Sequence, residues 1–195
     1  MSAKIILAST SPFRKEVLHK ILSNFDVDSP NIDESRINEE DIEDYVKRLA
    51  INKAQAIAAK HKAGLIIGSD QAAVISGKQE IIGKPADHNA AVEQLLSFSE
   101  KTVTFYTSLC LYDAADDSYQ VDIDPFNVGF RKLTKQQVES YLLKEKPYNC
   151  AGSFKSEKLG IALFSKMDGS DPNSLIGLPL IKLIDLLKNK GVEVL

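Results

Sequence analysis

Apolar residues in this chain fall into two patterns, short continuous blocks and longer stretches in which they recur every three or four positions. The blocks from Ile5 to Leu7 and from Leu65 to Ile75 have the length and the β-branched content of buried strands. The stretch from about Glu40 to His61 repeats apolar residues at helical spacing, so it predicts a long amphipathic helix. Alternating strands and helices of this kind predict an α/β fold.

Turn and cap residues divide the rest of the chain into further elements. Strands are expected at Thr102 to Tyr112 and Tyr119 to Phe130, and the turn-rich residues between them predict a hairpin. A hairpin inserted among alternating strands and helices indicates a mixed sheet rather than a purely parallel one. The other expected elements are a strand at Phe25 to Asp28, a polar loop at Ser29 to Asn38, helices capped by Asp87 and by Thr134, the latter ending at Leu143, a strand at Gly160 to Phe164 and a final helix at Asn173 to Lys190.

The block from Leu65 to Ile75 contains Gly68-Ser69-Asp70, which is expected to interrupt the strand. Ser76-Gly77-Lys78 then predicts a turn into a second strand that ends at Gly83. The chain shows no internal repeat, low-complexity tract or linker. We therefore expect residues 1–195 to form a single compact domain.

The first strand leads into a segment that is suited to binding phosphate. Small and hydroxyl residues form a loop from Ala8 to Ser11, and Ser11-Pro12 is typical of an N-cap followed by proline at the first helical position. The helix then opens with Arg14 and Lys15, although a first turn usually favours acidic residues because the helix N-terminus is partly positive. The hydroxyls of Ser9 and Ser11, the free N–H groups and the two cations predict an anion site, but a solvated surface helix would have the same pattern.

Composition narrows the classes of function. The chain has 195 residues, a formal net charge of −3 and a pI near 5.7, which disfavours a general nucleic-acid binder. No apolar run approaches the about 20 residues that span a bilayer, and the N-terminus lacks signal-peptide features, so we expect a cytoplasmic protein. Cys110 and Cys150 lack metal-ligand spacing and are expected to be reduced thiols.

Four charged residues could act beside a bound phosphate. Asp70 follows an apolar block where α/β sheets place ligand clefts, so it could hold Mg²⁺ or activate water, although an aspartate that caps a turn is an equal alternative. Glu34 could be a second oxygen ligand or a solvated loop acid. Lys53 lies on the apolar stripe of the predicted long helix, where a lysine can snorkel to solvent or point into a cleft. Lys84, between glycine and proline, fits a phosphate-facing cation in a rigid turn.

Four motifs follow one another along nearly the whole chain: Leu7-Ala8-Ser9-Thr10-Ser11-Pro12-Phe13-Arg14-Lys15, Ile67-Gly68-Ser69-Asp70-Gln71, Gly83-Lys84-Pro85 and Ala151-Gly152-Ser153-Phe154-Lys155-Ser156-Glu157. The glycine-rich nucleotide motifs and the zinc-protease and esterase motifs are absent. In order and content, the four motifs resemble those of the Maf family of nucleoside triphosphate pyrophosphatases. Four ordered motifs are far more specific than any one of them.

The resemblance implies an elongated mixed α/β body with two lobes around a central cleft, like that of the inosine triphosphatases. It also implies hydrolysis between the α- and β-phosphates of a nucleoside triphosphate with a divalent cation, Mg²⁺ or Mn²⁺. By position, Asp70 matches the family's proton acceptor and Glu34 its acidic metal-site residue, and Asp70 could be base, metal ligand or both. Arg14, Lys53 and Lys84 match phosphate-binding cations. The family also suggests a homodimer, whereas no nucleic-acid or membrane partner is expected.

Phe13, Gln71 and Glu157 occupy the places at which the family divides by substrate, and they resemble the branch that hydrolyses 7-methyl-GTP rather than dTTP and UTP. A carboxylate such as Glu157 can accept from both N1–H and N2–H₂ of guanine, whereas thymine and uracil offer one N–H between two carbonyls. Methylation at N7 makes the ring cationic, which favours pairing with Glu157 and stacking on Phe13. In the alternative interpretation, Phe13 staples the first helix and Glu157 pairs with Lys155 or Lys158.

Two other functions stay open at this point. The chain could be a dTTP and UTP pyrophosphatase of the same family. It could also be a nucleotide-sensing module that uses the same pocket without turnover, although the intact acid and lysine set argues against this.

Overall fold

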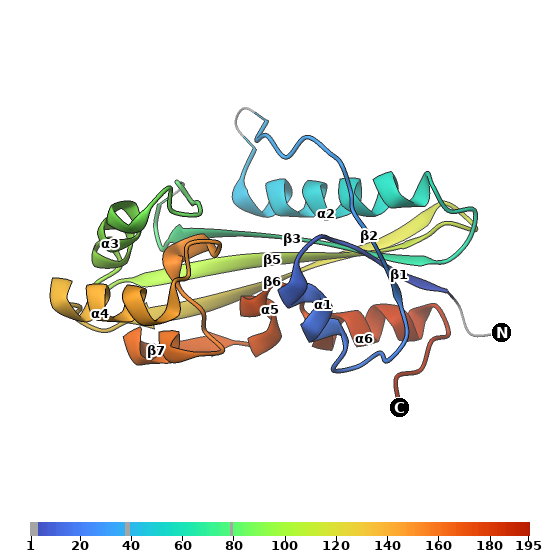
Figure 1. The fold of residues 1–195 in the computed structure, drawn as a ribbon. Coiled ribbons are helices and arrows are strands. Elements are labelled where there is room, and N and C mark those ends of the chain that lie inside the picture. Colours follow the sequence, from blue (N-terminus) through green and yellow to red (C-terminus); the bar gives the residue numbers. More distant parts are fainter. Residues whose placement is uncertain (1–3, 38–39, 79) are drawn as a thin grey trace. The chain divides into compact units, whose positions relative to one another are not determined.

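The computed structural model describes residues 4–37, 40–78 and 80–195 (Figure 1). In this part of the chain, seven strands form one sheet in the order β2-β1-β3-β5-β6-β7, and β4 pairs with β3. The strands are β1 (Ile5–Ala8), β2 (Asp26–Asp28), β3 (Leu65–Ile75), β4 (Ile81–Ile82), β5 (Thr102–Asp113), β6 (Ser118–Phe130) and β7 (Phe164–Gly169). β1 runs parallel to β2 and β3, whereas β4 is antiparallel to β3 and β7 is antiparallel to β6. The prediction of a mixed α/β fold is therefore confirmed.

Helices alternate with these strands along the chain, and two more follow β7. They are α1 (Pro12–Leu18), α2 (Ile42–Ala58), α3 (His88–Ser97), α4 (Lys135–Glu145), α5 (Pro172–Ile176) and α6 (Leu180–Asn189), with 3₁₀ helices η1 (Ala151–Ser153) and η2 (Leu159–Leu163). Three of them, α1, α3 and α4, start after the capping residues that the sequence predicted. The Ser11 hydroxyl accepts from Arg14 N, Asp87 accepts from Ala90 N, and Thr134 forms a capping box with Gln137.

The chain divides into two compact units. The first unit comprises Met1–Gln71, Tyr106–Asp124 and Asp171–Leu195, and the second comprises Ala72–Phe105 and Pro125–Ser170. The boundaries fall within or next to β3, β5 and β6, so each of these strands contributes residues to both units.

In the first unit, successive strand residues face opposite layers of helices, as the two-residue period of a strand requires. Ile6 and Ile66 pack in a cluster with Ala54 of α2. Their neighbours Leu7 and Ile67 pack in a second cluster, which contains Val17 and Leu18 of α1 and Leu183 and Leu187 of α6. Figure 1 shows the result, with α2 over one face of the sheet and α1 and α6 over the other.

The second unit is built around aromatic side chains. The ring of Phe154 meets those of Phe130 and Phe164 edge-on, at centroid distances of 5.7 and 5.0 Å. Edge-to-face pairs of this kind stabilise a core beyond the area that they bury. Helices α3 and α4 pack against each other in this unit.

Two expectations about the elements before residue 80 need correction. Strand β3 runs through residues 68–70 without interruption. Gly68 does not break the strand, and its missing side chain leaves room for the neighbouring helix α2. The expected long helix is shorter at both ends, since Asp41 caps α2 and the helix ends at Ala58. Asn38, the last residue of the predicted polar loop, and Gln79, which follows the predicted turn, lie outside the described residues.

The elements of the C-terminal region differ more from those expected. The expected strand at 160–164 is the 3₁₀ helix η2, and β7 begins only at Phe164. A Cβ on Gly160 would lie 2.2 Å from the Lys155 carbonyl oxygen, so this glycine permits a tight local fold. The expected final helix is two helices, because Gly177 adopts a left-handed φ of 115° and Pro179 follows it.

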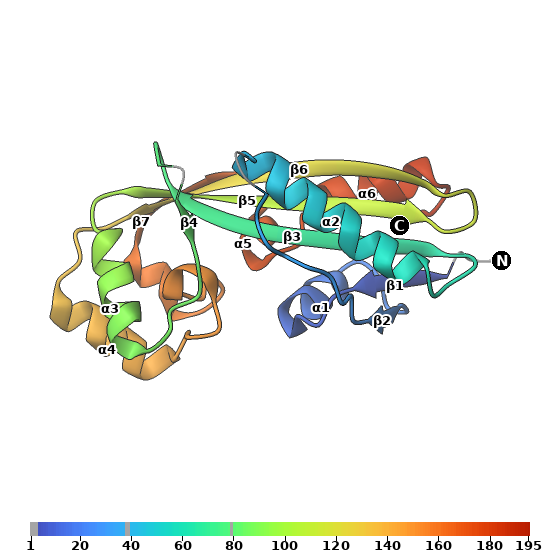
Figure 2. The same ribbon diagram turned by 90° about the horizontal axis from the view of Figure 1, so that it is seen from above.

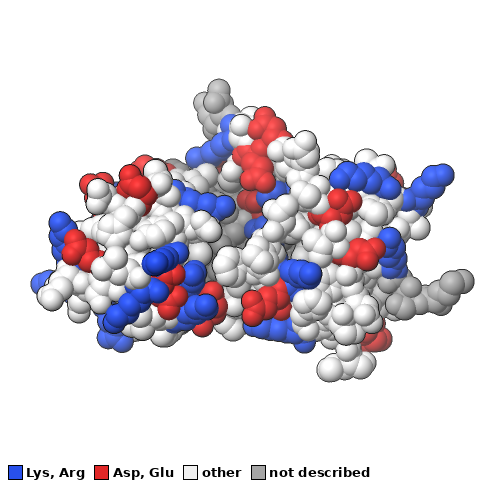
Figure 3. All heavy atoms as spheres, viewed as in Figure 1, with Lys and Arg blue, Asp and Glu red and all other residues white. Residues whose placement is uncertain are grey.

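Charged side chains of both signs are interspersed on the face shown in Figure 3, where no broad basic surface is present. Among the described residues, no helix combines the length and the apolar character needed to cross a membrane. Cys110 is buried and Cys150 partly buried, and both are free, as expected.

Candidate active site

Three predicted residues of the first unit meet around one ammonium group. Lys53 Nζ lies 2.6 Å from Asp70 Oδ1 and 2.9 Å from Glu34 Oε1. Lys53 and Asp70 are 6% and 7% exposed, whereas the Glu34 side chain is 58% exposed. Lys53 therefore does not snorkel to solvent, and a buried lysine with two carboxylates is the arrangement that the structure adopts.

The close approach of α2 and β3 brings Lys53 and Asp70 together. Asp70 stands near the middle of β3, and Lys53 stands on the buried face of α2. Figure 2 shows α2 lying along β3. A polar pair on the buried faces of both elements can persist only because each charge satisfies the other.

The loop between β1 and α1 supplies the predicted hydroxyl groups. Ser9 is buried, and its Oγ accepts from the backbone N–H of Ser11 at 3.1 Å. The Ser11 Oγ accepts from Arg14 N at 3.4 Å, so Ser11 caps the seven-residue helix α1. Each hydroxyl keeps its own proton as a donor for another group. Lys15, on the same helix, is exposed.

Arg14 is held by a segment that lies 163 positions later in the chain. Its Nε donates to the carbonyl oxygen of Gly177 at 2.8 Å. The same carbonyl accepts from the buried Ser69 hydroxyl at 2.9 Å, and Ser69 Oγ also lies 2.8 Å from the Ser108 carbonyl oxygen. The turn after α5 therefore fixes both Arg14 and the residue that precedes Asp70.

Burial and neighbouring charges shift the pKa values of two groups in this cluster. Burial raises the pKa of the Asp70 carboxyl above its ordinary value, against the opposing charges of Lys53 and Arg14. Burial also lowers the pKa of the Arg14 guanidinium, while Asp70 and Glu34 act in the opposite direction. Asp70 is thus a stronger base than a solvated aspartate, and it lies among cations.

Gln71, the predicted specificity residue next to Asp70, uses its amide nitrogen internally. Nε2 lies 2.8 Å from Thr107 Oγ1 and 2.7 Å from the Ser174 carbonyl oxygen. No hydrogen bond is present at Oε1 among the described residues, so Gln71 presents an acceptor to any ligand there.

Sequence reasoning missed the residues that support this cluster. Ser69, Thr107, Ser108, Ser174 and Gly177 connect β3, β5 and α5 through buried hydrogen bonds. The nearest available signals were a serine directly before Asp70 and the Gly177-Leu178-Pro179 sequence, which was instead included in the expected final helix.

For three other predicted residues, the structure describes only their local surroundings. Phe13 on α1 is partly buried, and no ring contact involves it in the described part of the chain. Lys84 and Glu157 belong to the second unit and are both exposed. Glu157 forms no ion pair with Lys155 or Lys158, and its Oε2 lies 3.5 Å from the Ser156 hydroxyl. Their roles remain predictions.

The donor set fits a divalent metal only in part. Within residues 4–37, 40–78 and 80–195, no group of three or more His, Cys, Asp or Glu side chains could hold a metal ion. Glu34 and Asp70 nevertheless place carboxylate oxygens on one shared cation. Mg²⁺ at phosphate sites commonly takes one or two carboxylates and completes its shell with substrate oxygens and water, so this pair fits a metal that binds with a phosphate.

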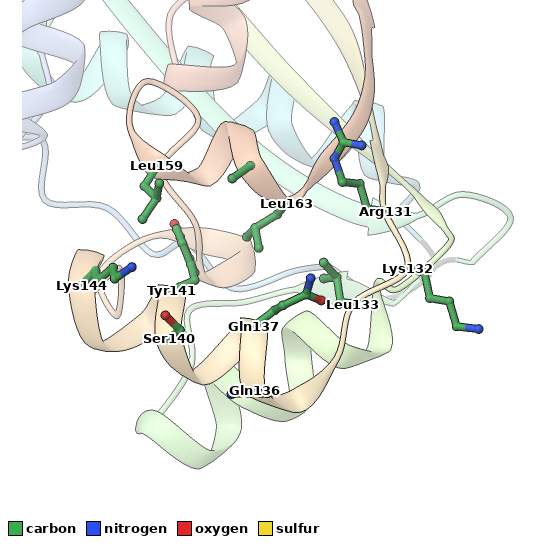
Figure 4. A pocket seen from close by; sticks show the side chains of 11 residues that line it. Arg131, Lys132, Leu133, Gln136, Gln137, Ser140, Tyr141, Lys144, Leu159 and Leu163 are labelled. Atoms are coloured by element: carbon green, nitrogen blue, oxygen red, sulfur yellow. The ribbon is translucent and has the colours of Figure 1, made fainter.

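A separate hollow of about 420 Å³ lies in the second unit and involves none of the predicted residues. Tyr141 of α4 and Leu159 and Leu163 of η2 point into it, whereas Lys132 points away from them (Figure 4).

Comparisons with known proteins place this chain in a family. Residues 4–190 match the family model described as Maf, Maf-like protein. The protein named 7-methyl-GTP pyrophosphatase from Colwellia psychrerythraea is 52% identical over 191 residues, covering 98% of this chain and 94% of that protein. The protein of the same name from Aliivibrio fischeri is 50% identical over 195 residues, covering both chains fully.

A more distant likeness is to a solved structure, the Staphylococcus aureus Ham1 protein. It has a TM-score of 0.46 and 17% identity, and the match covers 65% of this chain and 71% of that one. The family match over nearly the whole chain and the full-length relatives lead to one conclusion: this protein belongs to the Maf family.

Proposed function

We propose that this protein hydrolyses 7-methyl-GTP between the α- and β-phosphates and releases 7-methyl-GMP and pyrophosphate. The observation that carries the proposal is the buried Lys53 and Asp70 pair with Glu34 beside it. The substrate assignment is supported by relatives of about 50% identity that carry the name 7-methyl-GTP pyrophosphatase. It is also supported by Phe13, Gln71 and Glu157.

Asp70 is the proposed base. A water molecule attacks the α-phosphorus, its proton passes to the Asp70 carboxylate, and the bond from the α-phosphorus to the bridging oxygen breaks as pyrophosphate leaves. Because burial raises the pKa of Asp70, its carboxylate accepts this proton more readily than a solvated aspartate would.

The cations and hydroxyls are proposed to bind the triphosphate. Arg14, anchored on the Gly177 carbonyl, presents a fixed guanidinium, and Lys53 presents an ammonium on a flexible side chain. Ser9 and Ser11 offer hydroxyl donors at the start of α1, and Lys15 and Lys84 add positive charge. Such groups stabilise the charge that develops on the phosphate oxygens in the transition state.

Glu34 and Asp70 are the residues that would hold a divalent cation, Mg²⁺ or Mn²⁺. When bound, such an ion supplies charge neutralisation at the phosphate oxygens.

We propose that the guanine ring of the nucleotide is recognised through charge and stacking. Glu157 would accept from N1–H and N2–H₂ of guanine, and the ring of Phe13 would stack on the cationic methylated base. Gln71 would contribute an acceptor through Oε1, since its Nε2 is bonded internally. We propose the cytoplasm as the compartment and a nucleoside triphosphate as the substrate, without a nucleic-acid or membrane partner. The family suggests a homodimer.

A substrate panel tests this function. The protein is incubated with Mg²⁺ and separately with 7-methyl-GTP, GTP, dTTP or UTP, and monophosphate and pyrophosphate are resolved by chromatography. We expect 7-methyl-GTP to have the highest kcat/KM. Preference for dTTP or UTP would overturn the substrate assignment, and nucleotide-dependent thermal stabilisation without product would indicate a sensing module.

A further inference from the structure

Lys53 has two carboxylate partners, and they are the residues proposed to hold a metal. Its Nζ lies 2.6 Å from Asp70 Oδ1 and 2.9 Å from Glu34 Oε1. These are its only partners in the described part of the chain. The ammonium therefore stands at the point where the two carboxylates converge.

We infer that Lys53 acts as an internal cation that holds the place of the divalent metal until nucleotide arrives. The inference rests on the proposed function and concerns the order of binding at the same site. A metal ion held by both carboxylates would lie close to the present position of the ammonium, and like charges at such a distance repel strongly. Lys53 must leave before both carboxylates can bind the metal.

The incoming triphosphate gives Lys53 another anionic partner. A lysine ammonium sits on a flexible four-carbon stem with three rotatable donors, so it can turn from a carboxylate to a phosphate oxygen. This transfer fits the role of Lys53 as a phosphate-binding cation and frees the carboxylates in the same step. Metal and nucleotide should then bind together, while the metal alone binds weakly.

Arg14 is the other cation that acts on these carboxylates, and it is less able to move. Its guanidinium interacts with the charges of Asp70 and Glu34, but its Nε is fixed at 2.8 Å on the Gly177 carbonyl. Tyr45, which also lies nearby, donates its hydroxyl to the Glu34 carbonyl and not to the carboxylate. Lys53 is therefore the group whose movement opens the metal site.

Titration of Mn²⁺ without nucleotide tests the inference, with calorimetry as the readout. We expect the wild-type protein to bind Mn²⁺ weakly and Lys53→Met to bind it about tenfold more tightly or better, because one nearby positive charge is removed. Lys47→Met is the matched control, since Lys47 lies on the same helix and pairs with Glu43 at 3.6 Å. This control should bind Mn²⁺ as the wild type does.

A second measurement uses the wild-type protein alone, so it does not depend on the folding of a variant. The ligand is a GTP analogue with a methylene bridge between the α- and β-phosphorus. The protein with this analogue should bind Mn²⁺ about tenfold more tightly, or better, than either the protein alone or the analogue alone. Equal Mn²⁺ affinity with and without the analogue would overturn the inference. So would a folded Lys53→Met that binds Mn²⁺ no more tightly than wild type.

The two proposals can fail separately. If no nucleotide is hydrolysed but Lys53→Met binds Mn²⁺ more tightly, the proposed function fails and the place-holding role of Lys53 stands. If 7-methyl-GTP is hydrolysed but the Mn²⁺ affinities do not differ, the function stands and the place-holding role fails.

Discussion

A Cβ on Gly68 of β3 would lie 2.1 Å from the carbonyl oxygen of Ala50 on α2. No side chain larger than hydrogen fits between these two backbones. The absence of a side chain lets α2 lie close to β3, and the buried face of α2 then carries Lys53 to Asp70 at 2.6 Å. Gly68 lies two residues before Asp70 on β3, and Ala50 lies one turn before Lys53 on α2, so this contact sets the geometry of the candidate active site.

Gly68→Ala should therefore destabilise the protein and separate Lys53 from Asp70. We expect a loss of about 1–3 kcal/mol in the free energy of unfolding, because the extra methyl forces the backbones apart. Urea denaturation measures this loss. Gly83→Ala is the control, since a Cβ there would meet nothing within 4 Å and should change stability little. Equal stability of the two variants would show that the helix can shift without cost.

The sequence predicted the parts of the fold that depend on local chemistry. Ser11 and Pro12 start α1 as expected, and Thr134 starts α4, because capping groups act over three or four residues. The final helix was wrong because its apolar pattern continues across Gly177, whose left-handed backbone ends α5. The strand expected at 160–164 was wrong because a short apolar run has no distinctive period.

The candidate site was predictable only where a residue's local sequence indicates its role. Asp70 and Glu34 could be identified as acids in suitable places, and Lys53 was left between two interpretations. Only tertiary packing decides that this lysine is buried against both carboxylates. The anchoring of Arg14 on the Gly177 carbonyl joins residues 163 positions apart, and no local pattern reports such a contact.

Asp70→Asn should remove most turnover, because the amide cannot accept the proton from water. A loss of about 10²–10⁴-fold in kcat is expected for removal of a general base, measured by release of pyrophosphate from 7-methyl-GTP. The control is Asp26→Asn, an exposed aspartate of β2 that pairs with Lys4. Turnover of Asp70→Asn near that of Asp26→Asn would remove Asp70 from the mechanism.

The same substitution should have a pH-dependent effect on stability. Since the pKa of Asp70 is raised above 3.8 in the folded protein, its proton stabilises the folded state relative to the unfolded one. This contribution is fully present below pH 3.8 and is lost as the pH rises through the folded pKa. The wild type should therefore lose stability relative to Asp70→Asn over that range. Thermal melts of both proteins from pH 3 to 7 check the sign, and a difference that moves the other way would contradict the raised pKa.

Phe13 should set the preference for the methylated base. Phe13→Leu keeps an apolar side chain but removes the aromatic face, so the preference for 7-methyl-GTP over GTP should fall by about 0.5–2 kcal/mol. Phe13→Trp should raise this preference, because tryptophan offers the stronger face for a cation. The ratio of kcat/KM for the two nucleotides is the measurement. Unchanged ratios in both variants would indicate that Phe13 serves only to pack α1.

Glu157 should discriminate guanine from pyrimidines. In Glu157→Gln one carboxylate oxygen is replaced by an NH₂ donor, which can no longer accept from guanine but can donate to a carbonyl of uracil or thymine. We therefore expect kcat/KM to fall for GTP and to rise relative to it for UTP and dTTP. Glu139→Gln is the matched control, since Glu139 is a partly exposed acid of α4 paired with Lys135 at 3.8 Å. If both variants keep the wild-type ratio of GTP to UTP hydrolysis, then base selection depends on other residues, and the acceptor that Gln71 presents at Oε1 becomes the next group to change.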